Sequence, residues 1–118
     1  MIKNSKLQNL FKLSSKVTVI VPATININEE IDNTVFVEKV AALMSTCFGG
    51  ATATQTLGFW NSPTAGLVKE KSTTVFSYCQ ESDLQANIEK VIELCETLKA
   101  DMSQDAIALE INGEMYFI

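Results

Sequence analysis

The sequence predicts one α+β domain, a ferredoxin-like β-α-β-β-α-β sandwich with a C-terminal β-hairpin extension. Three observations predict it: a β-branched run near the start, two helical stripes that each join strand-like segments, and two hairpin signals. At 118 residues and 47% hydrophobic, the chain can bury a core without disulfides or metals. We expect residues 17–118 to form this domain and residues 1–16 to form a basic amphipathic arm.

The arm carries a short apolar stripe. Leu7, Leu10, Phe11 and Ser14 follow helical spacing, which predicts a short N-terminal amphipathic helix that ends near residues 14–15. Such a helix is too short to be stable alone. The β-branched run that follows, at 17–22, predicts a central strand because both of its faces are partly apolar.

The middle of the chain predicts a loop, a helix and a hairpin. The polar segment 23–33 is expected to be a loop, with Asp32, Asn33 or Thr34 available to cap the next helix. That helix is predicted from a stripe of Val37, Val40, Ala41, Met44 and Phe48. Gly49 and Gly50 end it. Residues 51–60 alternate with the period of a strand, and threonines line one of its faces. A turn follows at 61–66, and residues 67–79 return as a long strand.

The C-terminal third predicts the longest helix and a second hairpin. Ser82 and Gln85 have the spacing of a capping box, which predicts a helix beginning at Ser82 and continuing to about residue 102. The pair Asn112–Gly113 lies between two apolar runs, which is the strongest short signal for a hairpin.

A two-residue turn at Asn112–Gly113 fixes which side chains share a face. One face then carries Ile107, Leu109, Tyr116 and Ile118, which we expect to meet the helices. The other face carries Ala106, Ala108, Met115 and Phe117, out of reach of the helices. Soluble monomers rarely leave such a patch open. The arm, a second copy of the chain, or a foreign partner could cover it.

Composition narrows the classes of function. The chain has nine lysines, no arginine and no histidine, and its net charge is −5. We therefore expect no direct nucleic-acid binding and no membrane association, and a cytoplasmic location. Lysines interrupt the N-terminal region, and its apolar runs are too short to span a membrane. The three cysteines, Cys47, Cys79 and Cys95, include no C-x-x-C pair and are expected to be reduced core residues.

The sequence offers few groups for catalysis. Gly49–Gly50 follows a helix instead of preceding one, so it is a poor phosphate loop and a good helix cap. Glu70 and Glu110 form a conceivable acid–base pair on one sheet face, although solvated surface charge is the simpler interpretation. Trp60 is either a stacking platform or a packed rim residue. No catalytic residue, metal site or cofactor is predicted.

Several short motifs resemble those of a family of small uncharacterised proteins from bacterial plasmids and phages. The motifs are Phe48–Gly49–Gly50–Ala51–Thr52, Gly58-x-Trp60, Gly66–Leu67–Val68-x-Glu70, Gln104-x-Ala106, and Glu110-x-Asn112–Gly113–Glu114–Met115–Tyr116–Phe117. The resemblance covers about residues 17–118. It implies a mobile-element context and no particular activity.

The favoured functional hypothesis is a non-enzymatic protein-binding module that docks on a host protein, for instance to inhibit a defence protein. The alternative is a small-molecule site or a cofactor-free enzyme of the dimeric ferredoxin-like type, with Trp60, Tyr78, Tyr116 and Glu110 as candidate lining residues. A homodimer is expected in either case. The predicted interaction surface consists of Leu7, Leu10, Phe11, Trp60, Glu110, Met115 and Phe117.

Overall fold

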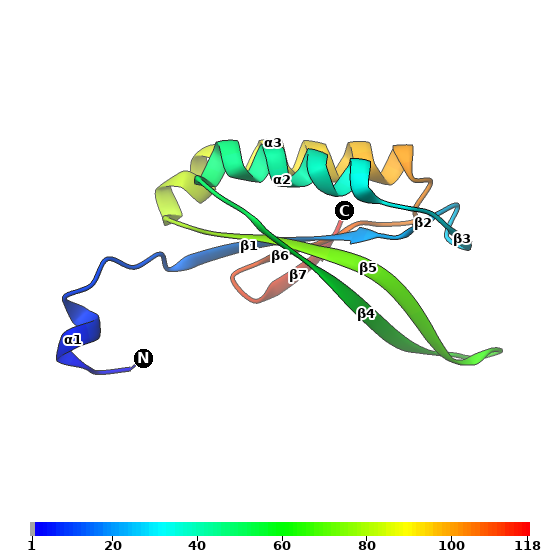
Figure 1. The fold of residues 1–118 in the computed structure, drawn as a ribbon, viewed down its shortest axis with the longest axis horizontal. Coiled ribbons are helices and arrows are strands. Elements are labelled where there is room, and N and C mark those ends of the chain that lie inside the picture. The colour runs from blue at the N-terminus through cyan, green and yellow to red at the C-terminus, as the bar shows by residue number, and fades with distance from the viewer. Residues whose placement is uncertain (1) are drawn as a thin grey trace.

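The computed structural model describes residues 2–118 and places two long helices on one face of a five-stranded sheet (Figure 1). The main elements are β1 (Ser15–Pro22), α2 (Thr34–Phe48), β4 (Thr52–Ser62), β5 (Gly66–Cys79), α3 (Glu81–Asp101), β6 (Ala108–Ile111) and β7 (Glu114–Phe117). Three short elements complete the set: α1 (Ser5–Gln8), β2 (Thr24–Ile25) and β3 (Glu29–Glu30).

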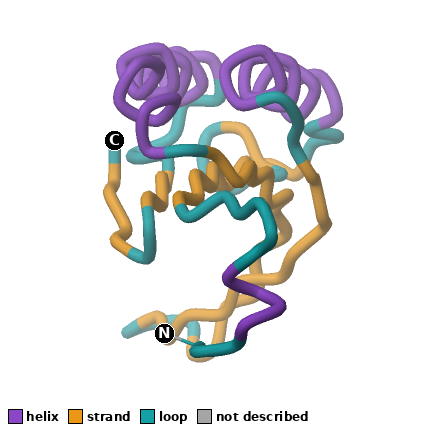
Figure 2. Tube along the Cα trace, turned by 90° about the vertical axis from the view of Figure 1, so that its left-hand side faces the viewer, coloured by secondary structure: helices purple, strands orange, loops and turns teal. Residues whose placement is uncertain are grey.

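The sheet is antiparallel throughout, with strand order β4-β5-β1-β6-β7. The predicted α+β class is confirmed by this arrangement. β1 occupies the centre, as its two partly apolar faces predicted. Figure 2 shows both long helices above the sheet, and only the short α1 of the projecting N-terminal segment on the other side. We call the side away from α2 and α3 the open face.

The core lies between the sheet and the two helices. β1 contributes Val17, Val19 and Val21, all fully buried. Around them pack buried side chains from the helices and neighbouring strands: Val40, Met44, Val75, Val91, Leu98, Ile107 and Leu109. Because alternate residues of a strand point to opposite faces, this valine row leaves Lys16, Thr18 and Ile20 on the open face.

The C-terminal end of α2 agrees with the prediction, whereas the start of α3 does not. Gly49 adopts φ 91° and its N–H donates to the Ser45 carbonyl at 2.8 Å, so the predicted glycine cap of α2 is confirmed. The capping box at Ser82 is wrong. α3 begins at Glu81, and Gln80 precedes it without a side-chain cap. Glu81 and Asp83 in the first turn instead favour the helix dipole.

The C-terminal hairpin has the register that the Asn112–Gly113 turn predicted. Both turn residues have positive φ, 52° and 87°, and Ala108 pairs with Phe117. The prediction that Tyr116 meets the helices is wrong, because its side chain is 45% exposed. β7 is an edge strand beyond the helices, and the Tyr116 hydroxyl donates to Glu114 at 3.0 Å. That carboxylate raises the pKa of Tyr116.

Two short segments differ from their predictions. The N-terminal helix covers only Ser5–Gln8 and does not continue to residues 14–15. Asn4 caps it by accepting N–H hydrogen bonds from Lys6 and Leu7. The expected loop at 23–33 contains the small β2–β3 ribbon. No helix in residues 2–118 is long and apolar enough to cross a membrane.

The molecule is elongated because two segments project from the domain. Its radius of gyration is 16.0 Å, against about 13 Å for a compact chain of this length. Residues 2–14, the described arm before β1, leave one end of the sheet, and the tip of the β4–β5 hairpin leaves the other (Figure 1). Both project on the side away from α2 and α3.

Packing in the core gives a first testable expectation. Met44 is fully buried in α2, whereas Val35 on the same helix is 61% exposed. Met44→Ala should lower the free energy of unfolding by about 2–5 kcal/mol, because it removes buried contacts and leaves a cavity. Val35→Ala, the control, should change it by less than about 0.5 kcal/mol. Urea denaturation measures both, and equal effects would contradict the described core.

The three cysteines should differ in reactivity. Cys79 and Cys95 are buried, and Cys47 is half-buried. Burial, and then the neighbouring Glu96 carboxylate, raises the pKa of Cys95 to about 11, so its reactive thiolate is scarce at pH 8. A thiol reagent should therefore modify Cys47 first in the native protein and all three in denaturant. Mass spectrometry of the time course checks the order, and early modification of Cys95 would contradict it.

Candidate functional site

The open face carries a cluster of hydroxyl groups where β4 pairs with β5. Thr56 of β4 lies opposite Ser72 and beside Thr74. Its Oγ1 is 2.8 Å from Ser72 Oγ and 3.0 Å from Thr74 Oγ1. The alternating threonines of residues 51–60 signalled this polar face, but not its bonding to Ser72 and Thr74. These hydroxyls supply hydrogen-bond donors and acceptors on the open face.

Glu70 and Trp60 lie further along the same hairpin and are joined to each other. Trp60 pairs with Val68, and Gly58 pairs with Glu70. The indole N–H of Trp60 donates to Glu70 Oε1 at 3.1 Å. Because Gly58 has no side chain, the space opposite Glu70 stays open. The result is an exposed carboxylate held in place beside an aromatic ring.

A cleft of about 370 Å³ lies on the open face between this hairpin and the β1–β6–β7 side of the sheet. We call it the open-face cleft. Its polar lining comes from Glu70, Lys71, Gln104 and the hydroxyl cluster. Its apolar walls are Ile20, Pro22, Ile27, Leu57, Ala106, Ala108 and Phe117. The side-chain amide of Gln104 donates to the backbone carbonyls of Thr24 and Met102.

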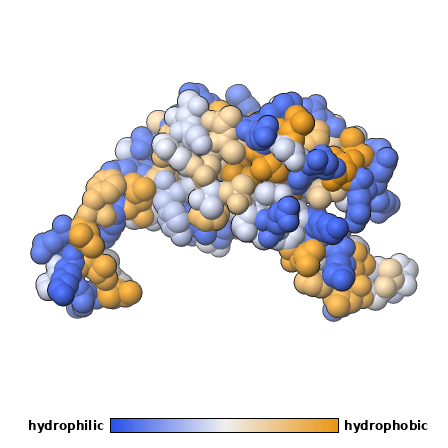
Figure 3. All heavy atoms as spheres, viewed as in Figure 1, coloured by the Kyte–Doolittle hydropathy of each residue, from blue (hydrophilic) through white to orange (hydrophobic). Residues whose placement is uncertain are grey.

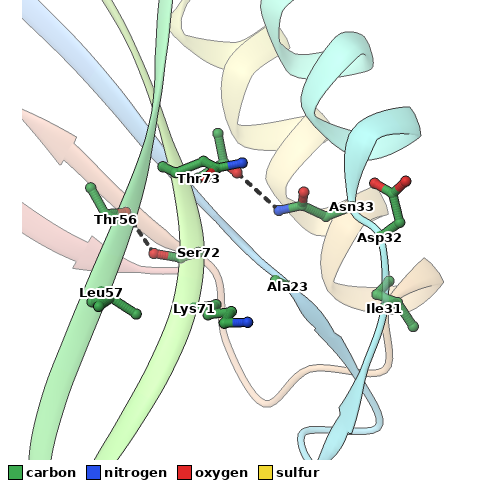
Figure 4. A pocket seen from close by; sticks show the side chains of 10 residues that line it. Ala23, Ile31, Asp32, Asn33, Thr56, Leu57, Lys71, Ser72 and Thr73 are labelled. Atoms are coloured by element: carbon green, nitrogen blue, oxygen red, sulfur yellow. Dashed lines mark hydrogen bonds between the residues drawn. The ribbon is translucent and has the colours of Figure 1, made fainter.

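A second cleft, of about 660 Å³, lies where the same hairpin faces the start of α2 (Figure 4). We call it the Asn33 cleft. The Asn33 side-chain amide donates to the Val21 carbonyl and to Thr73 Oγ1, which fixes it. Asp32 accepts hydrogen bonds from the hydroxyl and backbone N–H of Thr34, which lower its pKa. This places Asp32, and not Thr34, as the group capping the first turn of α2.

The two clefts differ in chemistry. The Asn33 side-chain N–H groups and the Asp32 Oδ1 atom are already used in holding the chain, and no aromatic residue lines their cleft. The open-face cleft combines a carboxylate with apolar and aromatic walls, which is the usual composition of a site for a small organic ligand. We therefore take the open-face cleft as the candidate site.

The candidate lining residues from the sequence are only partly brought together. Trp60, Tyr78 and Glu110 lie on the open face, and Tyr116 lies on the opposite face. Tyr78 is at the far end, where Lys16 Nζ lies 5.5 Å from its ring centroid. A ligand site between the sheet and the helices is not available, because core side chains occupy that space.

Glu70 and Glu110 share the open face but do not form a pair in one chain. Glu110 lies opposite Thr18, which lies opposite Phe76, and Glu70 is six residues from Phe76 along β5. Six strand residues span about 20 Å. The two carboxylates are therefore too far apart to act on one small molecule. Among residues 2–118, no group of three His, Cys, Asp or Glu side chains has the arrangement of a metal site.

Comparison with solved structures identifies proteins of the same overall fold. A phage SAM lyase in complex with S-methyl-5′-thioadenosine is similar, with 20% sequence identity and a TM-score of 0.63 over 93% of this chain and 92% of that chain. A phage SAM lyase in the apo state gives 19% identity and a TM-score of 0.62 over 93% and 95% of the two chains. Neither protein-family models nor curated protein sequences yield a match.

These similarities correct the functional prediction. The favoured hypothesis was a non-enzymatic protein-binding module that inhibits a host defence protein, and the similar solved structures are instead those of an enzyme. The prediction went wrong because it treated the lack of a recognisable catalytic motif as evidence against catalysis. The findings favour the alternative, a small-molecule site or a cofactor-free enzyme.

The hydroxyl cluster can be tested through stability. Thr56→Val keeps the shape of the side chain and removes the hydroxyl, leaving Ser72 and Thr74 without this partner. It should lower the free energy of unfolding by about 1 kcal/mol. Thr54 lies on the same face of β4 and is exposed, so Thr54→Val is the matched control. Chemical denaturation of both variants is the measurement, and equal midpoints would argue against the cluster.

Proposed function

We propose that this chain is a lyase that cleaves S-adenosylmethionine to S-methyl-5′-thioadenosine in the open-face cleft. The observation that carries the proposal is the cleft itself, which sets a fixed carboxylate beside apolar and aromatic walls in a fold similar to that of a SAM lyase. The low sequence identity makes the chemistry of the cleft, not the similarity, the deciding argument.

The two compounds define the bond that must break. S-adenosylmethionine has a positively charged sulfur bonded to a methyl group, to the 5′-carbon of adenosine and to the γ-carbon of an aminocarboxypropyl group. S-methyl-5′-thioadenosine keeps the first two, so the bond from sulfur to the γ-carbon breaks and its electron pair stays on sulfur. The four-carbon fragment then either closes on its own carboxylate or loses a proton. Both routes balance without an oxidant or reductant.

The open-face cleft has a group for each part of this substrate. The Glu70 carboxylate, oriented by the Trp60 indole N–H, binds its positive charge. The hydroxyls of Thr56, Ser72 and Thr74 suit the ribose hydroxyls. Ile20, Ile27, Leu57 and Phe117 provide apolar surface for the adenine ring.

The apolar walls also favour the reaction physically. The positive charge on sulfur disappears as the bond breaks, so an environment with little water destabilises the charged substrate more than the transition state. Holding the fragment's carboxylate near its γ-carbon would add the advantage of an intramolecular reaction. The protein then acts mainly by orientation and by excluding water, which is consistent with a chain that lacks histidine.

The finer fold assignment belongs to the same proposal. The order β4-β5-β1-β6 and the two helices on one face support a ferredoxin-like sandwich, with β7 as the added strand of the C-terminal hairpin. The expected cytoplasmic location suits an enzyme that acts on S-adenosylmethionine.

The direct test is incubation of the purified chain with S-adenosylmethionine. Chromatography with mass detection should show S-methyl-5′-thioadenosine formed in proportion to enzyme, and the mass of the four-carbon product separates ring closure from proton loss. No product at high enzyme concentration would refute the proposal.

Glu70→Gln should lower kcat/KM by about 10–100-fold, because one charge-assisted contact to the substrate is worth about 1.5–3 kcal/mol. The melting temperature should stay within about 2 °C of the wild-type value, because Glu70 is exposed. Glu89 is an exposed residue of α3, away from the open face, so Glu89→Gln is the matched control and should retain full activity. Wild-type activity in Glu70→Gln would remove Glu70 from the site.

A further inference from the structure

We propose that the N-terminal arm of one copy docks on the open face of a second copy and covers its open-face cleft. The docking itself stands on the arm and the open face, and only its effect on catalysis rests on the proposed function. The arm means residues 2–14, and the docking surface on the second copy consists of Ala106, Ala108, Met115 and Phe117.

The large apolar side chains of the arm are left exposed by the rest of their own chain. Ile2, Leu7, Leu10 and Phe11 are 75%, 50%, 62% and 78% exposed. α1 has four residues and no buried side chain. A helix of this length gains too little from its own hydrogen bonds to persist in water, so it needs a surface to rest on.

The open face offers a surface of matching character. Phe117 is 74% exposed and Met115 is 46% exposed, and neither has helix cover. The space-filling view shows apolar side chains on the arm and again on the projecting hairpin, at opposite ends of the molecule (Figure 3). The arm and the hairpin tip project to the same side (Figure 1). They therefore bracket the open face and leave room for another molecule.

Charge favours a second copy as that molecule. Residues 2–14 contain three lysines and no acidic residue, and residues 17–118 contain five lysines and fourteen acidic residues. The open face carries Glu70 and Glu110 but also Lys16, and Lys71 lines its cleft, so the excess negative charge belongs to the domain as a whole. The arm of one copy is thus complementary in charge to the acidic domain of another copy, and in apolar surface to its open face.

The size of the contact suits a self-associating chain. Each large side chain of the arm exposes on the order of 100 Å², so one docked arm removes a few hundred Å² from water on each partner. A reciprocal exchange doubles this total, which reaches the roughly 1,200–2,000 Å² of a stable interface. The smallest closed assembly that exchanges arms is a two-fold dimer.

Docking would also change the candidate site. Phe117 lines the open-face cleft and belongs to the docking surface. An arm lying across Phe117 therefore covers the cleft and excludes water from it, as the proposed cleavage requires. In this arrangement the cleft of each copy is complete only when another copy supplies its arm.

Sedimentation tests the docking without any assay of activity. The wild-type chain should sediment at twice the monomer mass or more at micromolar concentration. Leu10→Asp combined with Phe11→Asp should weaken self-association at least about 30-fold, because anchoring side chains are replaced by charges. Phe117→Asp should do the same from the other side. Val35→Asp, an exposed apolar position on α2, is the matched control and should leave the mass unchanged.

Mixing two defective variants tests whether the arm acts on another copy. One variant carries Leu10→Asp and Phe11→Asp with an intact cleft, and the other carries Glu70→Gln with an intact arm. Each alone should be at least about tenfold below wild type, and the mixture should regain a measurable fraction, because mixed assemblies pair a good arm with a good cleft.

The outcomes separate the two proposals. A monomeric wild type overturns the docking, whether its arm is protected from protease by its own sheet or remains cleavable. An active wild type whose mixture shows no recovery also overturns it. An assembled wild type that dissociates on arm substitution and yet produces no S-methyl-5′-thioadenosine supports the docking and refutes the proposed function.

Discussion

The central constraint on this structure is that both long helices pack against the same face of β1. The side chains of Val17, Val19 and Val21 all point toward α2 and α3 and are fully buried. The intervening residues of the strand must then point to the other face, which neither long helix covers. One buried row of valines thus fixes both the core and the existence of an open face, and the candidate site lies on that face.

The open face acquires its chemistry from the two hairpins that flank β1. The long β4–β5 hairpin brings Thr56, Glu70 and Trp60 to one side. The β6–β7 hairpin brings Phe117 to the other side, through a register set by two residues at positive φ. The cleft between them is lined by groups from distant parts of the sequence, which only the fold brings together.

This explains which features could be predicted from the sequence. The α+β class, the central strand and the register at Asn112–Gly113 follow from local patterns, namely apolar spacing and turn chemistry. The start of α3 did not, because the helix begins at Glu81, one residue before Ser82, without any side-chain cap. The cleft could not be predicted either. It depends on where the hairpin bends past the sheet, and Glu70 and Glu110 share a face without lying close together.

The most direct test of the account is an NMR titration with S-methyl-5′-thioadenosine, using isoleucine methyl groups and the single indole N–H as reporters. Ile20 and Ile27 line the open-face cleft, and Ile31 lines the Asn33 cleft on the other side of the same hairpin. The account predicts saturable shifts at Ile20, Ile27 and Trp60, with Ile31 unchanged. Shifts centred on Ile31, or no saturable shift at any of these groups, would contradict it.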